Sequence, residues 1–255
     1  MILAVDIGNS NIVIGCFDKN DIKFVERLST NHQSTQMEYT VMIKNILELN
    51  GLAGEHITGG IISSVVPPLT DTVKAAMERL GCGRVLTVGP GIKTGLKIML
   101  DDPAQLGSDR VADAVAAVNL YTPPLILVDM GTATTVSVID SERNFLGGMI
   151  IPGLRVSLDS LTSRTSQLPR ISLTPPRKLI GTNTIDCMKS GILNSTASSI
   201  DGITERIEDE LGEKCTVIAT GGLAGVIAPY CRRKITLDET LLLKGLRIIY
   251  EKNCG

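Results

Sequence analysis

Residues 2–10 read ILAVDIGNS, and residues 125–133 read LILVDMGTA near the middle of the 255-residue chain. Each stretch is an apolar, β-rich run that ends in Asp-x-Gly and continues into small residues with hydroxyl or amide groups. The two aspartates are Asp6 and Asp129. A buried strand that delivers a carboxylate to a tight turn suits a site for phosphate and metal. The sequence therefore predicts two such units that face each other around a nucleotide cleft.

The composition is that of an ordinary globular protein, with 43% hydrophobic and 20% charged residues. The net charge of −2 comes from interspersed acids and bases, so we expect no nucleic-acid partner and no membrane partner. The first apolar run stops at Asp6 without a basic flank, so we expect no ordinary signal peptide. No apolar stretch approaches the roughly 20 residues that span a bilayer.

Six cysteines are spread along the chain without a C-x-x-C pair or a nearby histidine, so they do not predict a zinc site. Cys16 and Cys215 lie inside apolar runs, where a free cysteine behaves as a small hydrophobic residue. We therefore expect a reduced, cytoplasmic protein. His32 and His56 are expected to be surface or structural residues, which leaves a histidine-based mechanism little support.

A β-meander followed by alternating helices and strands is predicted twice. In the first half, strands are expected at the opening run, 11–17, 22–28, 57–66 and 84–88, and helices at 36–50, 70–80 and 109–120. In the second half, strands are expected at 125–130, 134–139, 145–151 and 215–220, and helices after Pro152-Gly153, over most of 184–211 and at 237–250. The segment YTPP at 121–124 separates an N-terminal half, 1–122, from a C-terminal half, 123–255. This order predicts a duplicated α/β architecture of two βββαβαβα-type halves around a central cleft.

The two familiar phosphate-binding patterns are absent. GPGIKT at 89–94 has misplaced glycines for a P-loop, and no strand is followed by G-x-G-x-x-G. The Asp-x-Gly turns are therefore the phosphate candidates. Gly8 permits close backbone approach, Asp6 can hold a hydrated Mg²⁺, and donors come from three side chains, Asn9, Ser10 and Asn11. A simple hairpin turn would explain one copy, but two copies in matching contexts favour a phosphate site.

The segment LGSDR at 106–110 is expected to open a helix. Ser108 and Asp109 suit an ordinary helix start, where they accept N–H bonds and complement the dipole. Arg110 suits it less, because a cation in the first turn is electrostatically disfavoured, and an anionic substrate would explain its presence. The spacing leaves both interpretations open. The glycine pairs at 147–148 and 221–222 likewise have two interpretations. They could let the backbone approach a ligand, or they could simply form a strand-to-helix turn.

Taken in order, several motifs make the chain resemble the type III pantothenate kinases, members of the actin-like ATPase superfamily. They are Asp6-x-Gly8-Asn9-Ser10, Ser64-Val65-Val66-Pro67, Gly107-x-Asp109-Arg110, Asp129-x-Gly131-Thr132-Ala133, residues 147–153, Gly181-x-x-Thr184 and Thr220-Gly221-Gly222. Each motif is weak alone, but the ordered set spans essentially the whole chain. The resemblance implies a duplicated actin-like (ribonuclease H-like) fold. It also implies ATP-dependent phosphorylation of pantothenate to 4'-phosphopantothenate, the first step of coenzyme A biosynthesis.

The resemblance further implies roles for individual residues. The ATP phosphates would be bound by a loop comprising Asp6, Ile7, Gly8, Asn9, Ser10, Asn11, Ile12 and Val13, and Thr132 would also contact ATP. Asp6 would help to hold Mg²⁺, and Asp129 would bind the monovalent cation, K⁺ or NH₄⁺, that the family needs. The pantothenate site would include Gly107, Ser108, Asp109 as proton acceptor and Arg110 on the substrate carboxylate. Thr184 would contact pantothenate across a homodimer interface, which makes the dimer part of the active site.

One position departs from the family. Relatives commonly carry a tyrosine in the substrate pocket where this chain has Leu100, just before the segment DDP at 101–103. Leu100 cannot replace the hydrogen bond of a phenol, and one such bond is worth about 1 kcal/mol, a several-fold change in affinity. Two rival functions stay open. The first is a kinase of the same fold for another small carboxylated alcohol or a sugar, although Arg110 favours an acceptor with a carboxylate. The second is a non-catalytic nucleotide-binding regulatory or accessory protein, which would not need Asp109.

Overall fold

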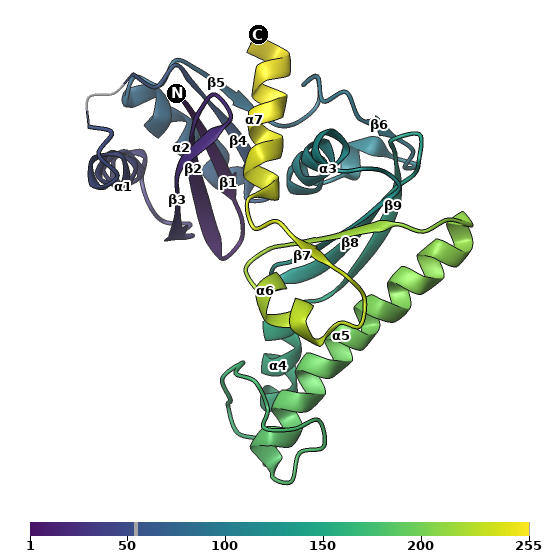
Figure 1. The fold of residues 1–255 in the computed structure, drawn as a ribbon. Coiled ribbons are helices and arrows are strands. Elements are labelled where there is room, and N and C mark those ends of the chain that lie inside the picture. The colour runs from purple at the N-terminus through teal and green to yellow at the C-terminus, as the bar shows by residue number, and fades with distance from the viewer. Residues whose placement is uncertain (54–55, 255) are drawn as a thin grey trace. The chain divides into compact units, whose positions relative to one another are not determined.

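The protein is described by a computed structural model that covers residues 1–53 and 56–254 (Figure 1). The first sheet contains five strands: β1 (Ile2–Ile7), β2 (Asn11–Asp18), β3 (Asp21–Ser29), β4 (Gly59–Ser64) and β5 (Arg84–Thr87). Their order is β3-β2-β1-β4-β5. β1, β2 and β3 form the predicted antiparallel meander, whereas β4 runs parallel to both β1 and β5.

The second sheet repeats this arrangement. Its strands are β7 (Leu125–Met130), β8 (Ala133–Ile139), β9 (Asn144–Pro152), β10 (Thr216–Thr220), β11 (Thr236–Leu237) and β6 (Lys97–Ile98). The order β9-β8-β7-β10-β11 matches the first sheet strand for strand, with the same antiparallel and parallel pairings. The predicted duplication is thus confirmed. The short strand β6, which extends the sheet beyond β9, was not predicted.

The helices are α1 (Gln36–Leu49), α2 (Pro67–Arg79), α3 (Ser108–Leu120), α4 (Leu154–Ser163), α5 (Thr184–Leu211), α6 (Ala224–Ile227) and α7 (Leu241–Cys254). Two 3-10 turns cover Pro103–Gln105 and Ala228–Tyr230. α2 begins three residues earlier than predicted, because proline fits the first helical turn, where its missing N–H needs no partner. α7 begins later than predicted because Thr236 and Leu237 pair with β10 instead. None of these helices, within the part of the chain that is described, is long and apolar enough to cross a membrane.

The chain forms two compact units, and their boundaries differ from those of the expected halves, 1–122 and 123–255. The first unit comprises residues 1–96, 101–119 and 240–255, and the second comprises 97–100 and 120–239. The C-terminal helix α7 therefore belongs to the first unit. Its Gly245 packs against the backbone of Ala112 in α3, so closely that a Cβ would overlap that carbonyl. This contact between segments far apart in sequence could not be read from local pattern.

The two faces of the first sheet carry different helices. On one face, alternate residues of β1 and β2 pack with α1 and α2 in a fully apolar core that includes Leu3, Val5, Ile14, Ile43 and Leu69. α7 lies along β1 and β4 on the opposite face (Figure 1). Glycines make room for it, because a Cβ at Gly15 or Gly59 would meet Leu243 or Tyr250 of α7.

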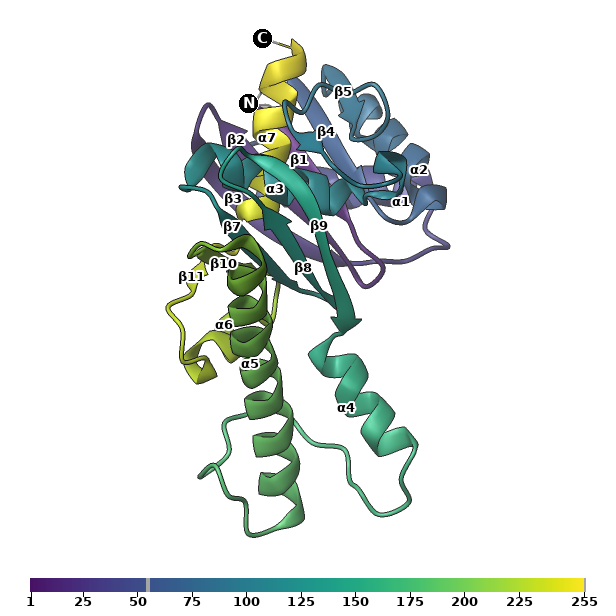
Figure 2. The same cartoon turned by 90° about the vertical axis from the view of Figure 1, so that its right-hand side faces the viewer.

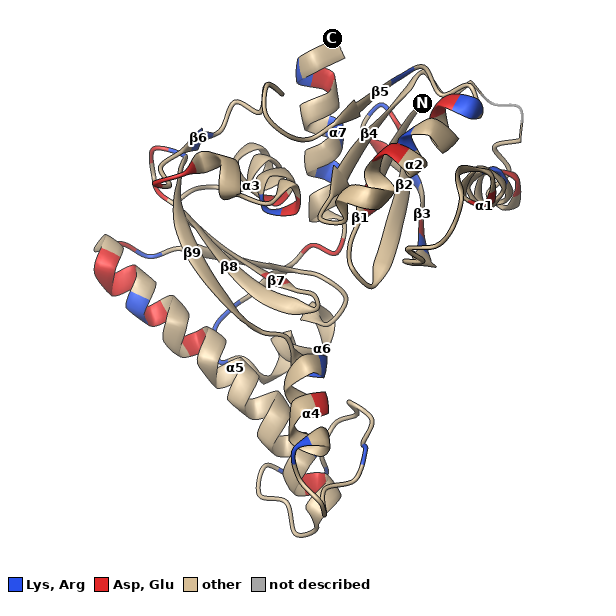
Figure 3. Cartoon of the chain, turned by 180° about the vertical axis from the view of Figure 1, so that it is seen from behind, with Lys and Arg blue, Asp and Glu red and all other residues tan. Residues whose placement is uncertain are grey.

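The second unit is built around the 28-residue helix α5. Its core joins β7, β8 and β10 to the helix through Ile126, Val128, Val136, Leu193 and Ala197. Asn183 caps the helix start by accepting the N–H of Asp186 at 2.9 Å. Figure 2 shows α4 and α5 extending beyond the sheet, with a loop between them. Figure 3 shows acidic and basic residues interspersed over the elements of each unit, with acidic residues frequent in the C-terminal part of α5.

Candidate active site

The first Asp-x-Gly turn joins β1 to β2 and is held by the residue that follows β3. The N–H of Gly8 donates to the carbonyl of Asn11 at 2.9 Å. Thr30 donates twice: its hydroxyl binds the Gly8 carbonyl at 2.6 Å, and its N–H binds the Ser10 carbonyl at 3.1 Å. Two carbonyl oxygens that would repel a phosphate are thus engaged by donors, which suits the turn to an anion.

Asp6 projects from the face of the first sheet that carries α7. Its neighbours in the sheet register are Val13 of β2 and Ser63 of β4. Because side chains alternate along a strand, Asp6 shares this face with Ala4 and Ser63, whereas Ile7 points into the opposite core. Asp6 is half-buried, and the following residues 9–11 are exposed. A carboxylate therefore stands beside an open turn of polar groups.

The end of β4 binds the start of α3. The Ser108 hydroxyl oxygen lies 3.0 Å from the hydroxyl oxygen of Ser63. It also accepts the N–H of Ser64 at 3.0 Å and donates to the Ser64 carbonyl at 3.1 Å. Ser108 immediately precedes Asp109, so these bonds tie Asp109 to the sheet that carries Asp6. The first unit thereby contains both the predicted ATP loop and the predicted substrate motif, residues 107–110.

The carboxylate of Asp109 folds back over Gly107. A Cβ at Gly107 would overlap the Oδ1 atom of Asp109, so only glycine leaves this carboxylate in its place. Asp109 Oδ1 accepts the backbone N–H of Arg110 at 2.7 Å. Burial lowers the pKa of the Arg110 guanidinium, and the adjacent Asp109 carboxylate partly opposes that shift. The guanidinium stays cationic, and a partly desolvated cation is stabilised by an anionic partner.

The second Asp-x-Gly turn is tighter than the first. Met130 pairs with Thr134 across the second hairpin, whereas Ile7 pairs with Ile12 across the first. The second tip, residues 131–133, is therefore one residue shorter. Its Gly131 N–H donates to the Ala133 carbonyl at 3.1 Å. The two copies share a strand order but differ in the turn, so they present different groups to a ligand.

Two glycines lie close to the second Asp-x-Gly turn. A Cβ at Gly221, which has φ +88°, would overlap Asp129 Oδ1, and a Cβ at Gly153 would overlap the carbonyl oxygens of Gly131 and Thr132. This neighbourhood of the second unit offers a carboxylate and backbone carbonyls, the oxygen donors that a K⁺ ion prefers. The residues present thus fit a monovalent cation. No group of three His, Cys, Asp or Glu side chains suited to a metal occurs among the described residues.

The structure places the remaining predicted site residues in the second unit. Leu100 follows β6 and lies against β9, where a Cβ at Gly147 would be 3.5 Å from its Cδ2 atom. Thr132 is exposed at the tip of the second turn, and Thr184 is exposed at the first residue of α5. The first unit therefore groups residues 6–13 with 107–110, and the second contains Leu100, Asp129, Thr132 and Thr184.

Two residues that support the predicted site were not found from sequence. Thr30 holds the ATP loop, and Ser63 contacts Ser108. Thr30 carries no local signal, because its role follows from the pairing of β2 with β3. Ser63 offered a weak one: it is a polar residue in the apolar run at 57–66, directly before the quoted motif Ser64-Val65-Val66-Pro67.

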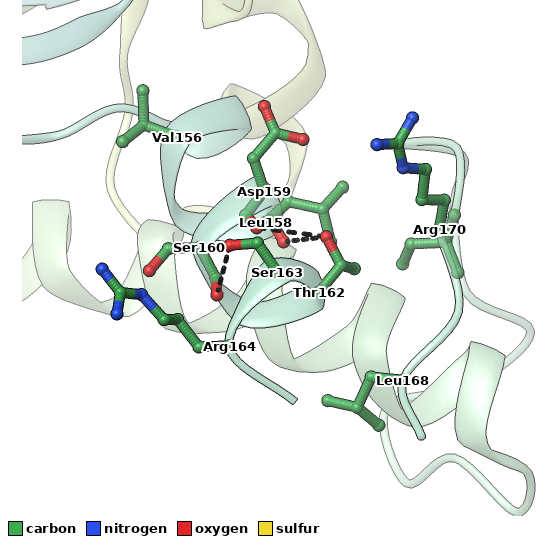
Figure 4. Close-up of a pocket in the computed structure, with 10 residues that line it drawn as sticks. Val156, Leu158, Asp159, Ser160, Thr162, Ser163, Arg164, Leu168 and Arg170 are labelled. Carbon is green, nitrogen blue, oxygen red and sulfur yellow. Dashed lines mark hydrogen bonds between the residues drawn. The ribbon is translucent and has the colours of Figure 1, made fainter. Parts of the chain in front are cut away.

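A cavity of about 730 Å³ in the second unit contains none of the predicted site residues (Figure 4). It lies against α4 and the segment that follows, and Arg164 and Arg170 both line it. The hydroxyls of Thr162 and Ser163 donate to carbonyls of their own helix, at 3.1–3.3 Å, rather than to the cavity.

Comparison with known proteins gives a consistent family. The sequence profile described as "Type III pantothenate kinase" matches residues 2–206. A type III pantothenate kinase of Brevibacillus brevis is 44% identical over 253 residues, which cover 99% of this chain and 99% of that protein.

Solved structures support the fold. A Campylobacter jejuni protein described as a Baf family transcriptional activator superposes with a TM-score of 0.61 at 20% identity, over 98% of each chain. The activator of 2-hydroxyisocaproyl-CoA dehydratase from Clostridium difficile, with bound ADPNP, superposes with a TM-score of 0.58 at 12% identity, over 99% of this chain and 96% of that one. At these identities the likeness shows the fold alone, and it agrees with the predicted duplicated actin-like architecture.

Proposed function

Because the chain belongs to the type III pantothenate kinase family, we propose that it transfers the γ-phosphoryl group of ATP to the primary hydroxyl of pantothenate. The product would be 4'-phosphopantothenate, at the first step of coenzyme A biosynthesis. One observation carries the proposal beyond the family match: Asp109 and the half-buried Arg110 stand at the start of α3, bound to the sheet that holds the Asp6 turn.

The Asp6 turn is proposed to bind the ATP phosphates. Gly8 lets the backbone approach closely, and the exposed residues 9–11 present amide and hydroxyl groups. Thr30 keeps two loop carbonyls engaged, which lowers the repulsion that a phosphate would meet. Mg²⁺ would neutralise phosphate charge, and Asp6 is the carboxylate of the first unit placed to hold it, through water or phosphate oxygens.

Asp109 is proposed to accept the proton of the attacking hydroxyl. Phosphoryl transfer passes through a loose transition state, so the proton need leave only late and no strong base is required. What matters is the position of the carboxylate relative to the attacking oxygen. The contacts of Asp109 with Gly107 and with the Arg110 N–H hold that position.

Arg110 is proposed to bind the carboxylate of pantothenate. A guanidinium offers two parallel N–H donors to a carboxylate, and burial of Arg110 strengthens the attraction by excluding water. A neutral sugar offers no negative charge to complement this partly desolvated cation. The same geometry therefore favours a carboxylated acceptor over a sugar.

The remaining partners follow from the second unit and the family. We propose that Asp129 and nearby carbonyls bind K⁺ or NH₄⁺, that Thr132 contacts ATP, and that Thr184 reaches the pantothenate of a second subunit in a homodimer. Three exposed apolar side chains lie near Thr184 in the sequence, and they suit such an interface: Leu179, Ile180 and Ile185. All six cysteines are free, which agrees with a cytoplasmic enzyme.

Release of ADP, measured with and without pantothenate in K⁺ and then in Na⁺ buffer, tests the activity and the cation together. We expect turnover that depends on pantothenate and is stimulated by K⁺. A panel of sugars and of other small hydroxy acids serves as the control for acceptor identity. ATP hydrolysis that is indifferent to pantothenate would instead favour another acceptor or a non-catalytic role.

A further inference from the structure

We propose that Ser63 is a positioning residue for phosphoryl transfer. Its buried hydroxyl holds the first turn of α3, and with it Asp109, against the strand that is paired with the Asp6 turn. The inference rests on the proposed kinase activity and adds to it a residue that touches neither substrate.

Ser63 is a polar residue in a fully buried position. It is 0% exposed and follows the buried apolar residues Ile61 and Ile62 in β4. Burying a hydroxyl is unfavourable unless it forms a hydrogen bond. Since β1 and β4 are parallel and Asp6 pairs with Ser63, the two side chains project from the same face of the sheet.

The bonds around Ser108 assign Ser63 as the donor. A serine hydroxyl has one proton and two acceptor lone pairs. Ser108 uses its proton on the Ser64 carbonyl at 3.1 Å and one lone pair on the Ser64 N–H at 3.0 Å. The Ser108 oxygen also lies 3.0 Å from the Ser63 oxygen, and Ser63 as donor is the arrangement that satisfies all three contacts with one Ser108 proton. The Ser108 hydroxyl has no capacity left for a substrate, and any contact with one falls to the Ser108 backbone.

The hydrogen bonds that join Ser63 and Ser64 to Ser108, here called the clamp, also position the residues that follow Ser108. Ser108 opens α3, and Asp109 and Arg110 follow directly, so a shift of this turn moves the proposed base and the proposed carboxylate ligand together. Small displacements of a reacting group are costly in rate even when ligands still bind. Loss of the Ser63 hydroxyl should therefore lower kcat more than it raises the KM for ATP.

The neighbouring serine provides a matched control. Ser64 points to the other face of the strand, where its hydroxyl accepts the Val66 N–H at 3.1 Å and the Thr70 hydroxyl at 2.9 Å. Those bonds close the turn into α2 and do not reach α3. Ser64→Ala thus removes the same group from the next residue without loosening the clamp through its side chain.

The test is steady-state kinetics of the full chain carrying Ser63→Ala, Ser108→Ala, both changes, or Ser64→Ala, each with a melting curve. We expect Ser63→Ala to lower kcat about tenfold while the KM for ATP changes less than about twofold, and Ser64→Ala to keep kcat within about twofold. Since Ser63 acts through Ser108, the double variant should be no slower than Ser108→Ala alone.

The proposal is overturned if folded Ser63→Ala keeps the unsubstituted kcat, if its effect adds fully to that of Ser108→Ala, or if Ser64→Ala loses as much. If Ser63→Ala does not fold, the same kinetic measurements are made on Ser63→Cys, in which a thiol, a weak donor, replaces the hydroxyl. If the unsubstituted protein releases no ADP with pantothenate, the proposed function fails. If it is active and the Ser63 variants match it, only the positioning role fails.

Discussion

The Oδ1 atom of Asp109 accepts the backbone N–H of Arg110 at 2.7 Å, which turns the carboxylate back over Gly107. The bond places an acidic group in the first turn of α3, where the helix dipole stabilises negative charge. It also fixes the proposed base and the proposed carboxylate ligand as adjacent residues of one rigid turn. The following predictions test what each group in and around this turn does.

Asp109→Asn should keep ligand binding and lose most turnover. The amide preserves the size of the side chain but cannot accept the hydroxyl proton, and general-base contributions are typically about 100-fold or more. Calorimetric titration with ATP and pantothenate checks binding, and ADP release checks kcat. Turnover near that of the unsubstituted enzyme would remove Asp109 from the mechanism.

Gly107→Ala should lower kcat about tenfold by displacing the Asp109 carboxylate, because the new Cβ overlaps Oδ1. Gly89→Ala is the matched control in the same unit, since a Cβ there meets nothing within 4 Å. Both variants should melt close to the unsubstituted protein. Equal kcat in the two variants would show that the carboxylate finds its place without the glycine.

Arg110→Lys should raise the KM for pantothenate by about tenfold or more, with a smaller change in the KM for ATP. Lysine keeps the charge but loses the paired N–H donors that match a carboxylate. A pantothenate analogue with a neutral amide in place of the carboxylate is the control, and its KM should respond much less. Similar losses for both acceptors would exclude a contact between Arg110 and the carboxylate.

Asp129→Asn should abolish most of the K⁺ stimulation of ADP release. In the proposed site the Asp129 carboxylate would supply negative charge beside neutral backbone carbonyls, so its loss should weaken cation binding. Titration of KCl at constant ionic strength, made up with tetramethylammonium chloride, measures the effect. An unchanged K⁺ dependence would mean that the cation binds elsewhere.

Glu208→Gln should destabilise the second unit at neutral pH. Arg233 binds Glu208 with two hydrogen bonds of 2.5 and 2.7 Å, and Lys214 adds a third at 2.7 Å. These bonds lower the pKa of Glu208 from 4.5 to about 2. A depressed pKa means that the stabilisation is complete above about pH 4.5 and is lost as the pH falls towards 2.

Urea unfolding of Glu208→Gln measures this effect. We expect a loss on the order of 2 kcal/mol at pH 7, from charge-assisted bonds to a buried carboxylate. The difference from the unsubstituted protein should shrink steadily below pH 4. A difference that is independent of pH between 7 and 3 would contradict the assignment of the stabilisation to the ionised carboxylate.

Much of the fold could be predicted because its signals are local. Apolar, β-rich runs marked β1, β2 and β7, and Gly51 marked the end of α1. The capping box that Thr35 and Glu38 form at the start of this helix was not predicted. The repeated strand-Asp-x-Gly pattern predicted the duplication, which the matching strand orders confirm. β6 and β11 were missed, since a strand of two residues has no period to detect.

The candidate site, like the fold, was predicted where its signals are local and was missed where they are not. Residue type and motif order were enough to propose Asp6, Asp109 and Asp129 and to suggest a family. The supporting contacts of Thr30 and Ser63 were invisible, because each depends on which strands pair and in which register. One residue of slip in β4 would turn Ser63 to the opposite face and break its bond to Ser108.

The sequence by itself determined that two similar strand-turn units exist and which carboxylates they deliver, since these follow from the chemistry of adjacent residues. Only the tertiary structure decided that the two turns differ in length, that α7 packs with the first unit, and that β4 clamps the start of α3. The physical reason is that hydrogen bonds and close packing between distant segments depend on strand register and on which backbone approaches a given glycine, as Ala112 approaches Gly245, and no local pattern encodes either.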